Sequence, residues 1–158
     1  MARIFISYKC DVSPDAEVAN ELVQLLRAQH HQVFIDHSMP PGSLWAKRIE
    51  EELTQADFLV LLLSEHSVLS EMVKAEIETA HRLGKAQQGR PRILPVRLDY
   101  HEPLQYPLSA YLNRIQWALW ESEADTPRLI PAEREAAFDQ MVAAAYRHGQ
   151  ALNMAAHL

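Results

Sequence analysis

The sequence predicts an α/β fold in which a five-stranded, mostly parallel sheet is covered by helices on both faces. Short apolar runs alternate with longer segments of helical periodicity along the chain. One run, Phe58 to Leu63, is apolar at every position, as a central parallel strand buried on both faces requires. The length of 158 residues suits one domain with its own core. Together these observations favour a flavodoxin-like, doubly wound arrangement.

The first half of the chain supplies three strands and two helices. Ser13, Pro14 and Asp15 predict a helix start, with a capping hydroxyl, a proline suited to the first turn and an acid that complements the helix dipole. This helix is expected to end near His30. The expected strands are residues 3–7, 33–35 and 58–63, and a second helix is expected to begin at Ser43 after the breaker Pro40-Pro41-Gly42.

The second half continues the alternation. A helix is expected from about Ser70 to Leu83, ended by Gly84. Pro95 lies inside the next expected strand and lacks an amide donor, which would normally place that strand at a sheet edge or bulge. The remaining expected elements are a strand over residues 93–98, a connection over 99–113 with at most one helical turn, a strand over 115–119 and a closing helix over 131–150.

Composition and charge exclude several classes of protein. Acidic residues outnumber basic ones by 21 to 15, for a formal charge of −6, which argues against binding to nucleic acid or anionic membrane by this domain. The longest apolar run is far shorter than the ~20 residues of a membrane-spanning helix. Cys10 is the only cysteine, so no intramolecular disulfide forms and a reducing, cytoplasmic location is expected. The run Ile4-Phe5-Ile6 is too short and too β-branched for the apolar stretch of a signal peptide, so export is not expected.

Ligands of doubly wound sheets bind outside the carboxyl ends of the strands, which here are residues 7–11, 36–43, 64–76 and 99–101. None of the four glycines follows the first strand, so a dinucleotide, Walker or flavin phosphate loop is excluded. A phosphoacceptor receiver domain needs a carboxylate at the end of the third strand, and this chain has Ser64 there, so that class is excluded as well. The eight histidines show no paired spacing, so no metal site is expected, and Cys10 has no neighbouring base and is expected to be inert.

Glu76 is the most informative carboxylate. On a helical wheel Val73, Ile77 and Ala80 form the buried stripe, and Glu76 falls about 60° from Val73, at the margin of that stripe. A carboxylate where helix meets sheet, near the strand ends, is partly desolvated and suits a functional role. The alternative is a boundary glutamate whose carboxylate extends into solvent.

Three segments carry a family resemblance. The runs Ile4 to Tyr8, Val33 to Asp36 with the following Pro-Gly loop, and Ser70 to Ile77 resemble, in order and spacing, the Toll/interleukin-1 receptor (TIR) domain family. The resemblance covers about residues 3–148. It implies a TIR domain over residues 1–150, with residues 151–158 as a tail that leads towards a sensor domain.

The resemblance implies an activity and a site. One branch of the family cleaves NAD⁺ at the nicotinamide–ribose bond with a glutamate on the third helix, and Glu76 occupies the matching position. NAD⁺ is then substrate, and no cofactor is implied. Glu76 would stabilise the oxocarbenium charge, orient the ribose or trap the ribosyl group, and the sequence leaves these roles open. The matching substrate-binding positions are Ser7, Tyr8, Lys9, Phe34, Asp36 and Met72.

Other interpretations of these positions stay open. Tyr8 either stacks on a base or packs at a strand end, Phe34 is better explained as core, and Asp36 and Ser43 also suit a turn residue and a helix cap. Met72 replaces a tryptophan that active relatives often carry, and Cys10 replaces a second cation. Both departures change the pocket while leaving the glutamate in place.

The resemblance also implies self-association. The loop between the second strand and second helix, the BB loop, completes the pocket of a neighbouring copy in active members, and its counterparts here are His37, Pro40, Pro41, Gly42, Ser43 and Trp45. Assembly triggered by a fused or partner sensor would switch on the enzyme in bacterial anti-phage immunity. The alternatives are a non-catalytic scaffold that uses the same surfaces and, more remotely, a nucleoside deoxyribosyltransferase-like enzyme.

Overall fold

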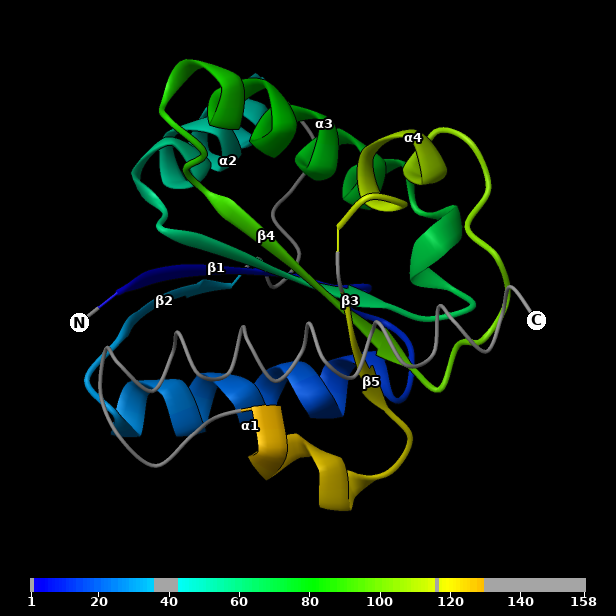
Figure 1. Ribbon diagram of the computed structural model, residues 1–158. Coiled ribbons are helices and arrows are strands. Elements are labelled where there is room, and N and C mark those ends of the chain that lie inside the picture. The colour runs from blue at the N-terminus through cyan, green and yellow to red at the C-terminus, as the bar shows by residue number, and fades with distance from the viewer. Residues whose placement is uncertain (1, 36–42, 116, 130–158) are drawn as a thin grey trace.

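A computed structural model describes residues 2–35, 43–115 and 117–129. Its sheet has five parallel strands in the order β2-β1-β3-β4-β5, which is the flavodoxin-like order (Figure 1). The predicted fold class is therefore confirmed. The strands are β1 (Arg3–Ser7), β2 (Gln32–Ile35), β3 (Phe58–Leu63), β4 (Arg92–Leu98) and β5 (Ala118–Trp120); the helices are α1 (Asp15–Ala28), α2 (Ser43–Gln55), α3 (Glu71–Ala86) and α4 (Leu108–Leu112), with 3₁₀ helices η1 (Ser67–Leu69) and η2 (Glu123–Leu129).

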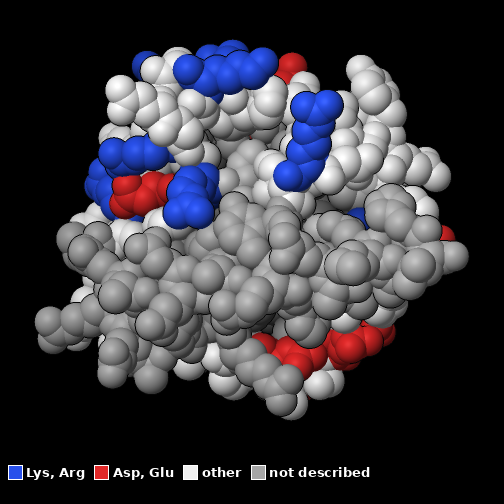
Figure 2. Space-filling view, in the orientation of Figure 1, with Lys and Arg blue, Asp and Glu red and all other residues white. Residues whose placement is uncertain are grey.

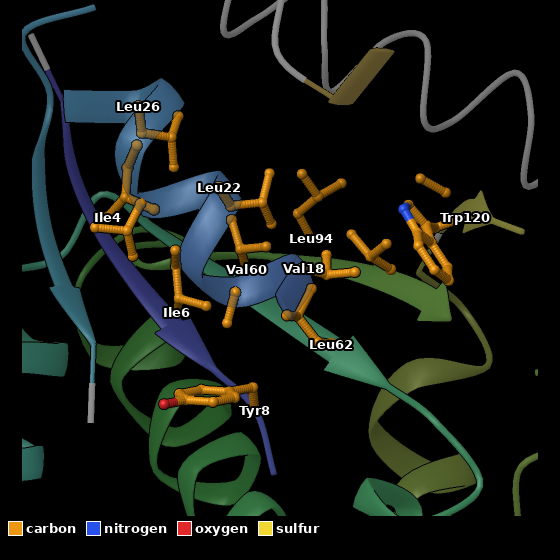
Figure 3. Packing of buried hydrophobic residues seen from close by; sticks show 14 of the residues in the cluster. Ile4, Ile6, Tyr8, Val18, Leu22, Leu26, Val60, Leu62, Leu94 and Trp120 are labelled. Carbon is orange, nitrogen blue, oxygen red and sulfur yellow. The ribbon is translucent and has the colours of Figure 1, made fainter. Parts of the chain in front are cut away.

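Helices cover both faces of the sheet. Helix α1 and η2 lie on one face, and α2, α3 and α4 lie on the other (Figure 1). Along β1, Ile4 and Ile6 pack towards α1, whereas Phe5 between them packs with residues of α2 and α3. This alternation follows from the two-residue period of a strand, which sends successive side chains to opposite faces. Figure 3 shows the α1 side of this core, with Ile4, Ile6 and Val60 facing Leu22 and Leu26.

The strand β3 lies at the centre of the sheet, between β1 and β4. Its bounds agree with the expected residues 58–63. Leu59, Leu61 and Leu63 pack under α2, α3 and α4, while Val60 and Leu62 pack under α1. Burial on both faces explains the continuous apolar run in the sequence.

Pro95 lies in a strand that pairs on both sides, so its expected demotion to a sheet edge is wrong. Main-chain amides alternate in direction along a strand. The amide of Arg92 donates to the carbonyl of Asp57 on the β3 side, and the amide of Asp99 donates to the carbonyl of Trp120 on the β5 side. Pro95 lies four residues before Asp99, an even number, so its nitrogen faces the same side as the Asp99 amide, which is the β5 side. Because β5 begins only at Ala118, opposite Val96, the missing amide costs no ladder hydrogen bond.

Gly84 does not end the third helix as expected. Helix α3 continues through it to Ala86, and the chain turns at Gln88 and Gly89, whose φ angles are 58° and 86°. The amide of Gly89 donates to the carbonyl of Gly84 at 2.7 Å, so Gly89 is the residue in the left-handed conformation that closes the helix.

Two further boundaries differ from the sequence prediction. Ser13 makes no capping hydrogen bond, because α1 begins at Asp15 after Pro14 and the Ser13 hydroxyl donates to Glu17 Oε1 at 2.7 Å instead. The fifth strand begins at Ala118 because Ile115 still belongs to the helical turn that ends α4, its amide donating to Leu112. The expected closing helix, residues 131–150, lies outside the described residues.

The charged side chains are unevenly distributed. On the face shown in Figure 2, lysines and arginines gather over α2 and α3, and acidic side chains gather at the opposite edge beside η2. None of the described helices is long and apolar enough to cross a membrane.

Candidate functional site

Helix α3 carries Glu76 and is fixed at its start. The Ser70 hydroxyl caps it, accepting a hydrogen bond from the Val73 amide at 3.3 Å. Val73 and Ile77 then pack on Leu61 and Leu63 of β3 in one core cluster. This packing sets the height and rotation of α3 above the carboxyl half of the sheet.

Glu76 is buried, with 3% of its surface exposed. The wheel placed this residue at the margin of the apolar stripe, and the structure places it inside the buried face of α3. Glu71 and Glu78 on the same helix are exposed. Glu76 is thus held out of water, unlike Glu71 and Glu78, and a buried carboxylate near strand ends is a candidate for a functional role.

Ser7 lies on the same side of the sheet as Glu76. Alternation along β1 puts it on the face of Phe5, and it pairs in register with Leu61, which packs against Val73 and Ile77. Ser7 is 2% exposed, and its hydroxyl makes no hydrogen bond to the described residues. The end of β1 therefore presents a polar atom towards the α3 side.

Tyr8 lies on the other side. It is buried in the core cluster of α1 and the sheet, beyond Ile6 at the end of β1 (Figure 3). Packing at a strand end is one of the two interpretations left open by the sequence, and the structure shows that packing. Contact of the Tyr8 ring with a substrate stays a prediction.

The remaining predicted substrate-binding residues have varied surroundings. Lys9 and Met72 are half-buried, at the end of β1 and in the first turn of α3. Phe34 packs against the core, with its ring centroid 5.0 Å from that of Phe5 and 5.6 Å from the guanidinium carbon of Arg48. Phe34 is half-buried, so the structure shows its packing against the core, and its contact with a substrate stays a prediction.

Several predicted loop residues are not described. Asp36, His37, Pro40, Pro41 and Gly42 lie outside the described residues. Ser43 and Trp45 belong to the first turn of α2, and their side chains also lie outside what the structure describes. The predicted role of this segment in assembly therefore stays a prediction.

One buried polar pair was missed by the sequence analysis. Asp15, in the first turn of α1, has no exposed surface, and its Oδ2 accepts a hydrogen bond from Ser64 Oγ at 2.7 Å. The sequence contained a signal, since Asp15 lies three, four and seven residues before Val18, Ala19 and Leu22, and so falls on the buried stripe of α1.

Burial raises the pKa of the Asp15 carboxyl above its model-compound value of 3.8. The Ser64 hydroxyl, main-chain amides and the nearby His66 oppose this rise.

Burial also raises the pKa of the Cys10 thiol, helped by Asp11. A raised thiol pKa leaves less thiolate at neutral pH, which agrees with the prediction of an inert cysteine.

A pocket of about 430 Å³ lies at the carboxyl ends of β3, β4 and β5. Its lining includes Ser64, Asp99, His101 and Trp120, and Glu76 is not among the lining residues. Arg97 is buried and fixes the loop 99–102, because its guanidinium donates to the carbonyls of Tyr100 and Glu102 at 3.3 and 2.7 Å.

Within the described part of the chain, three side chains lie close enough to share a metal ion: Asp99, His101 and Glu121. All three are exposed. His101 Nε2 lies 3.1 Å from Asp99 Oδ1 and 3.6 Å from Glu121 Oε2, which are ordinary distances between polar side chains on a protein surface.

The fold and the residues at its strand ends define a doubly wound α/β domain with a buried glutamate on the helix that follows the central strand. The chain belongs to the TIR domain family, whose family model matches residues 4–141. This match confirms the family that the sequence resemblance indicated.

Solved structures share the fold at low sequence identity. A 2-deoxyribosyltransferase from Bacillus psychrosaccharolyticus is 15% identical, with a TM-score of 0.59 over 89% of this chain and 96% of that one. A CMP N-glycosidase from Clostridium botulinum, BcmB, is 14% identical, with a TM-score of 0.57 over 77% and 92%. The TIR domains of the activated Roq1 resistosome are 15% identical, with a TM-score of 0.51 over 63% of this chain and 58% of that one. No curated protein matches the sequence.

Proposed function

We propose that this TIR domain is an NAD⁺ glycohydrolase and that Glu76 is its catalytic residue. The observation that carries the proposal is the burial of Glu76, at 3% exposure, on the helix that follows the central strand of a TIR fold. This position coincides with the catalytic glutamate that the family resemblance implies. The products are nicotinamide and ADP-ribose or a cyclic isomer.

The chemistry needs only one carboxylate. The bond between the ribose C1′ and the nicotinamide nitrogen breaks, and its electron pair goes to the nitrogen, so the cationic ring leaves as neutral nicotinamide without a general acid. Glu76 stabilises the oxocarbenium charge that develops on the ribose. Water then adds to C1′ and releases a proton, whereas attack by a purine nitrogen gives the cyclic product.

The fold accommodates sugar-transfer chemistry elsewhere. Two of the structural neighbours are named as an N-glycosidase and a deoxyribosyltransferase. At 14 and 15% identity they support the fold alone, and the substrate rests on the family and on Glu76. Deoxynucleosides should therefore be tested beside NAD⁺.

The direct test compares nicotinamide release from NAD⁺ by the wild type, Glu76→Gln and Glu78→Gln. Glu78 is the matched control, because it is an exposed glutamate on the same helix. We expect Glu76→Gln to lose activity by at least about a hundredfold, as for removal of one transition-state contact in other enzymes, and Glu78→Gln to keep it. Equal activity in all three proteins would contradict the proposal. Release of base from deoxynucleosides alone would favour the transferase.

We further propose that this domain assembles with copies of itself and that a sensor outside residues 1–150 controls this assembly, in bacterial anti-phage defence. The similarity to the TIR domains of an activated resistosome favours assembly, while the sensor and the role in defence rest on the family resemblance. If light scattering shows assembled protein that releases no nicotinamide from NAD⁺, the non-catalytic scaffold becomes the better description.

A further inference from the structure

We propose that Asp15 is a positioning residue that, through Ser64, holds the connection between β3 and α3, and with it Glu76, at the carboxyl end of the sheet. The role rests on the proposed function of Glu76. The hydrogen bonds themselves are independent of it.

Ser64 is the centre of the connection. Its hydroxyl donates to Asp15 Oδ2 at 2.7 Å and accepts from the main-chain amides of His66 and Ser67 at 3.2 and 3.1 Å. The single proton of the hydroxyl and both of its lone pairs are therefore used. The carboxylate of Asp15 fixes the direction of the proton, which leaves the lone pairs facing the two amides of the turn.

Ser67 extends this network. Its hydroxyl donates to the carbonyl of Leu62 at 2.9 Å and accepts from the amide of Ser64 at 2.7 Å. The amide of Ser70 then donates to the carbonyl of Ser67 at 3.0 Å, and Ser70 caps α3 through Val73. A continuous chain of hydrogen bonds thus leads from Asp15 to the first turn of the helix that carries Glu76.

The network is buried. Asp15 and Ser67 have no exposed surface and Ser64 is 2% exposed. Out of water, hydrogen bonds are stronger, and a polar group left without its partner is costly. Such a network specifies one arrangement of the turn, whereas apolar packing alone allows small shifts along the contact surface.

The position of Asp15 connects two parts of the candidate site. Asp15 follows the loop that carries Tyr8 and Lys9, and Ser64 begins the loop that leads to Met72 and Glu76. These loops leave β1 and β3, neighbouring strands that lead to crossovers on opposite faces of the sheet. Ligands of doubly wound sheets bind at such a switch point. The Asp15–Ser64 hydrogen bond therefore ties together the two loops that flank it.

A positioning role predicts a specific kinetic effect. A displacement of about 1 Å in a catalytic group can cost about a hundredfold in rate. Asp15 acts through Ser64 on the turn that leads into α3, whereas Tyr8 is also held by the core cluster, so loss of Asp15 should affect the position of Glu76 most, lowering kcat with little change in KM for NAD⁺. A purely structural role would instead lower the amount of folded protein and leave kcat per folded molecule intact.

The experiment uses Asp15→Asn, Asp15→Leu and Ser64→Ala, with Glu17→Gln as the control on the exposed side of the same turn. Asparagine keeps an oxygen that accepts from Ser64, whereas leucine keeps the branching at Cγ, removes the acceptor and is larger, so Ser64→Ala serves as the variant that removes the same hydrogen bond without added volume. We expect Asp15→Leu and Ser64→Ala to lower kcat at least about tenfold with KM within about twofold, and Asp15→Asn and the control to stay within about threefold of the wild type.

Amide hydrogen exchange over residues 64–76 gives a second readout that does not need activity. We expect exchange there to accelerate at least about tenfold in Asp15→Leu and Ser64→Ala, with residues 78–86 unchanged.

Unchanged exchange over 64–76 overturns the proposal, and so does an equal loss of kcat in Asp15→Asn and Asp15→Leu. If the wild type releases no nicotinamide, the proposed function fails and exchange alone decides whether Asp15 holds the connection. If Asp15→Leu does not fold, Ser64→Ala decides.

Discussion

Asp15 and Glu76 are two buried carboxylates on helices that cover opposite faces of the sheet. Each lies near the carboxyl ends of the strands, and each belongs to the buried stripe of its helix. Asp15 accepts a hydrogen bond from the hydroxyl of Ser64, which belongs to the turn after β3, whereas Glu76 occupies the position of the catalytic glutamate that the family resemblance implies. The two residues therefore represent different uses of a buried acid, one to hold a loop and one, by our proposal, to act on a substrate.

The raised pKa of Asp15 gives a pH dependence of stability. Above pH 3.8 the unfolded chain releases this proton while the native state retains it up to its raised pKa. The contribution of Asp15 to the free energy of unfolding therefore falls as pH rises through that window. Asp15→Asn removes this contribution, so the stability of the variant relative to the wild type should increase from pH 3.8 upwards and then level off. Urea unfolding at a series of pH values measures this difference, and a difference independent of pH would contradict it.

Cys10 offers a second test at the residue scale. Burial, and then Asp11, raises the pKa of its thiol above 9.0. Because the thiolate is the nucleophile, iodoacetamide should modify Cys10 at neutral pH at least about tenfold more slowly in the native protein than in urea. Mass spectrometry of timed samples measures the two rates. Equal rates would show that the native thiol is neither protected nor shifted.

The sequence allowed part of this residue-scale picture to be predicted. Helical periodicity placed Glu76 at the margin of the apolar stripe, and the structure places it inside the buried face of α3. The same periodicity also placed Asp15 on the buried stripe of α1, but an acid at a helix start has a simpler explanation in the helix dipole. Its partner Ser64 lies 49 residues away, and periodicity carries no information about such a contact.

At the scale of elements, Gly84 lies in the interior of α3 and gains nothing from its conformational freedom. A Cβ added there would meet only the Cα of Gly89, at 4.0 Å, an ordinary contact distance. Gly84→Ala should therefore stabilise the protein by about 0.5–1 kcal/mol, because alanine loses less backbone entropy in a helix. Thermal and urea unfolding measure the gain. Gly89→Ala is the matched comparison and should destabilise, since its φ of 86° is strained for any other residue.

Element types were easier to predict than their ends. The strand β3 follows from apolar residues alone, because burial on both faces leaves no other pattern. The end of α3 does not follow in this way, since the chain holds two glycines within six residues and only Gly89 adopts a positive φ. The start of β5 depends on Ile115 staying with α4, which is a tertiary contact.

At the scale of the whole molecule, the strand order brings distant segments together. Placing β1 between β2 and β3 puts Ser7 and the start of α3 on one side of the same sheet edge, although more than 60 residues separate them in the sequence. Alternation of strands and helices predicts this order for a doubly wound fold. It does not predict the second half of the pocket, because the segment from Asp36 to Gly42 is proposed to act on a neighbouring copy.

That proposal predicts a rate that depends on concentration. If one copy completes the pocket of the next, nicotinamide release per chain should rise with protein concentration over about a hundredfold range and then reach a plateau, by mass action. A pocket complete within one chain gives a constant rate per chain. The measurement is the initial rate at saturating NAD⁺, with light scattering on the same samples.

A mixture of two inactive variants gives the stricter form of this test. Glu76→Gln retains the loop segment and lacks the carboxylate, while Trp45→Ala retains Glu76 and alters the predicted assembly segment. When the two are mixed, the intact segment of the first can complete the pocket of the second, so activity should return in the mixture although each variant alone is inactive. Assembly without recovered activity would mean that segment and carboxylate must belong to the same chain. The site would then be complete in a monomer, and control by assembly would have to act on the shape of the pocket rather than on its composition.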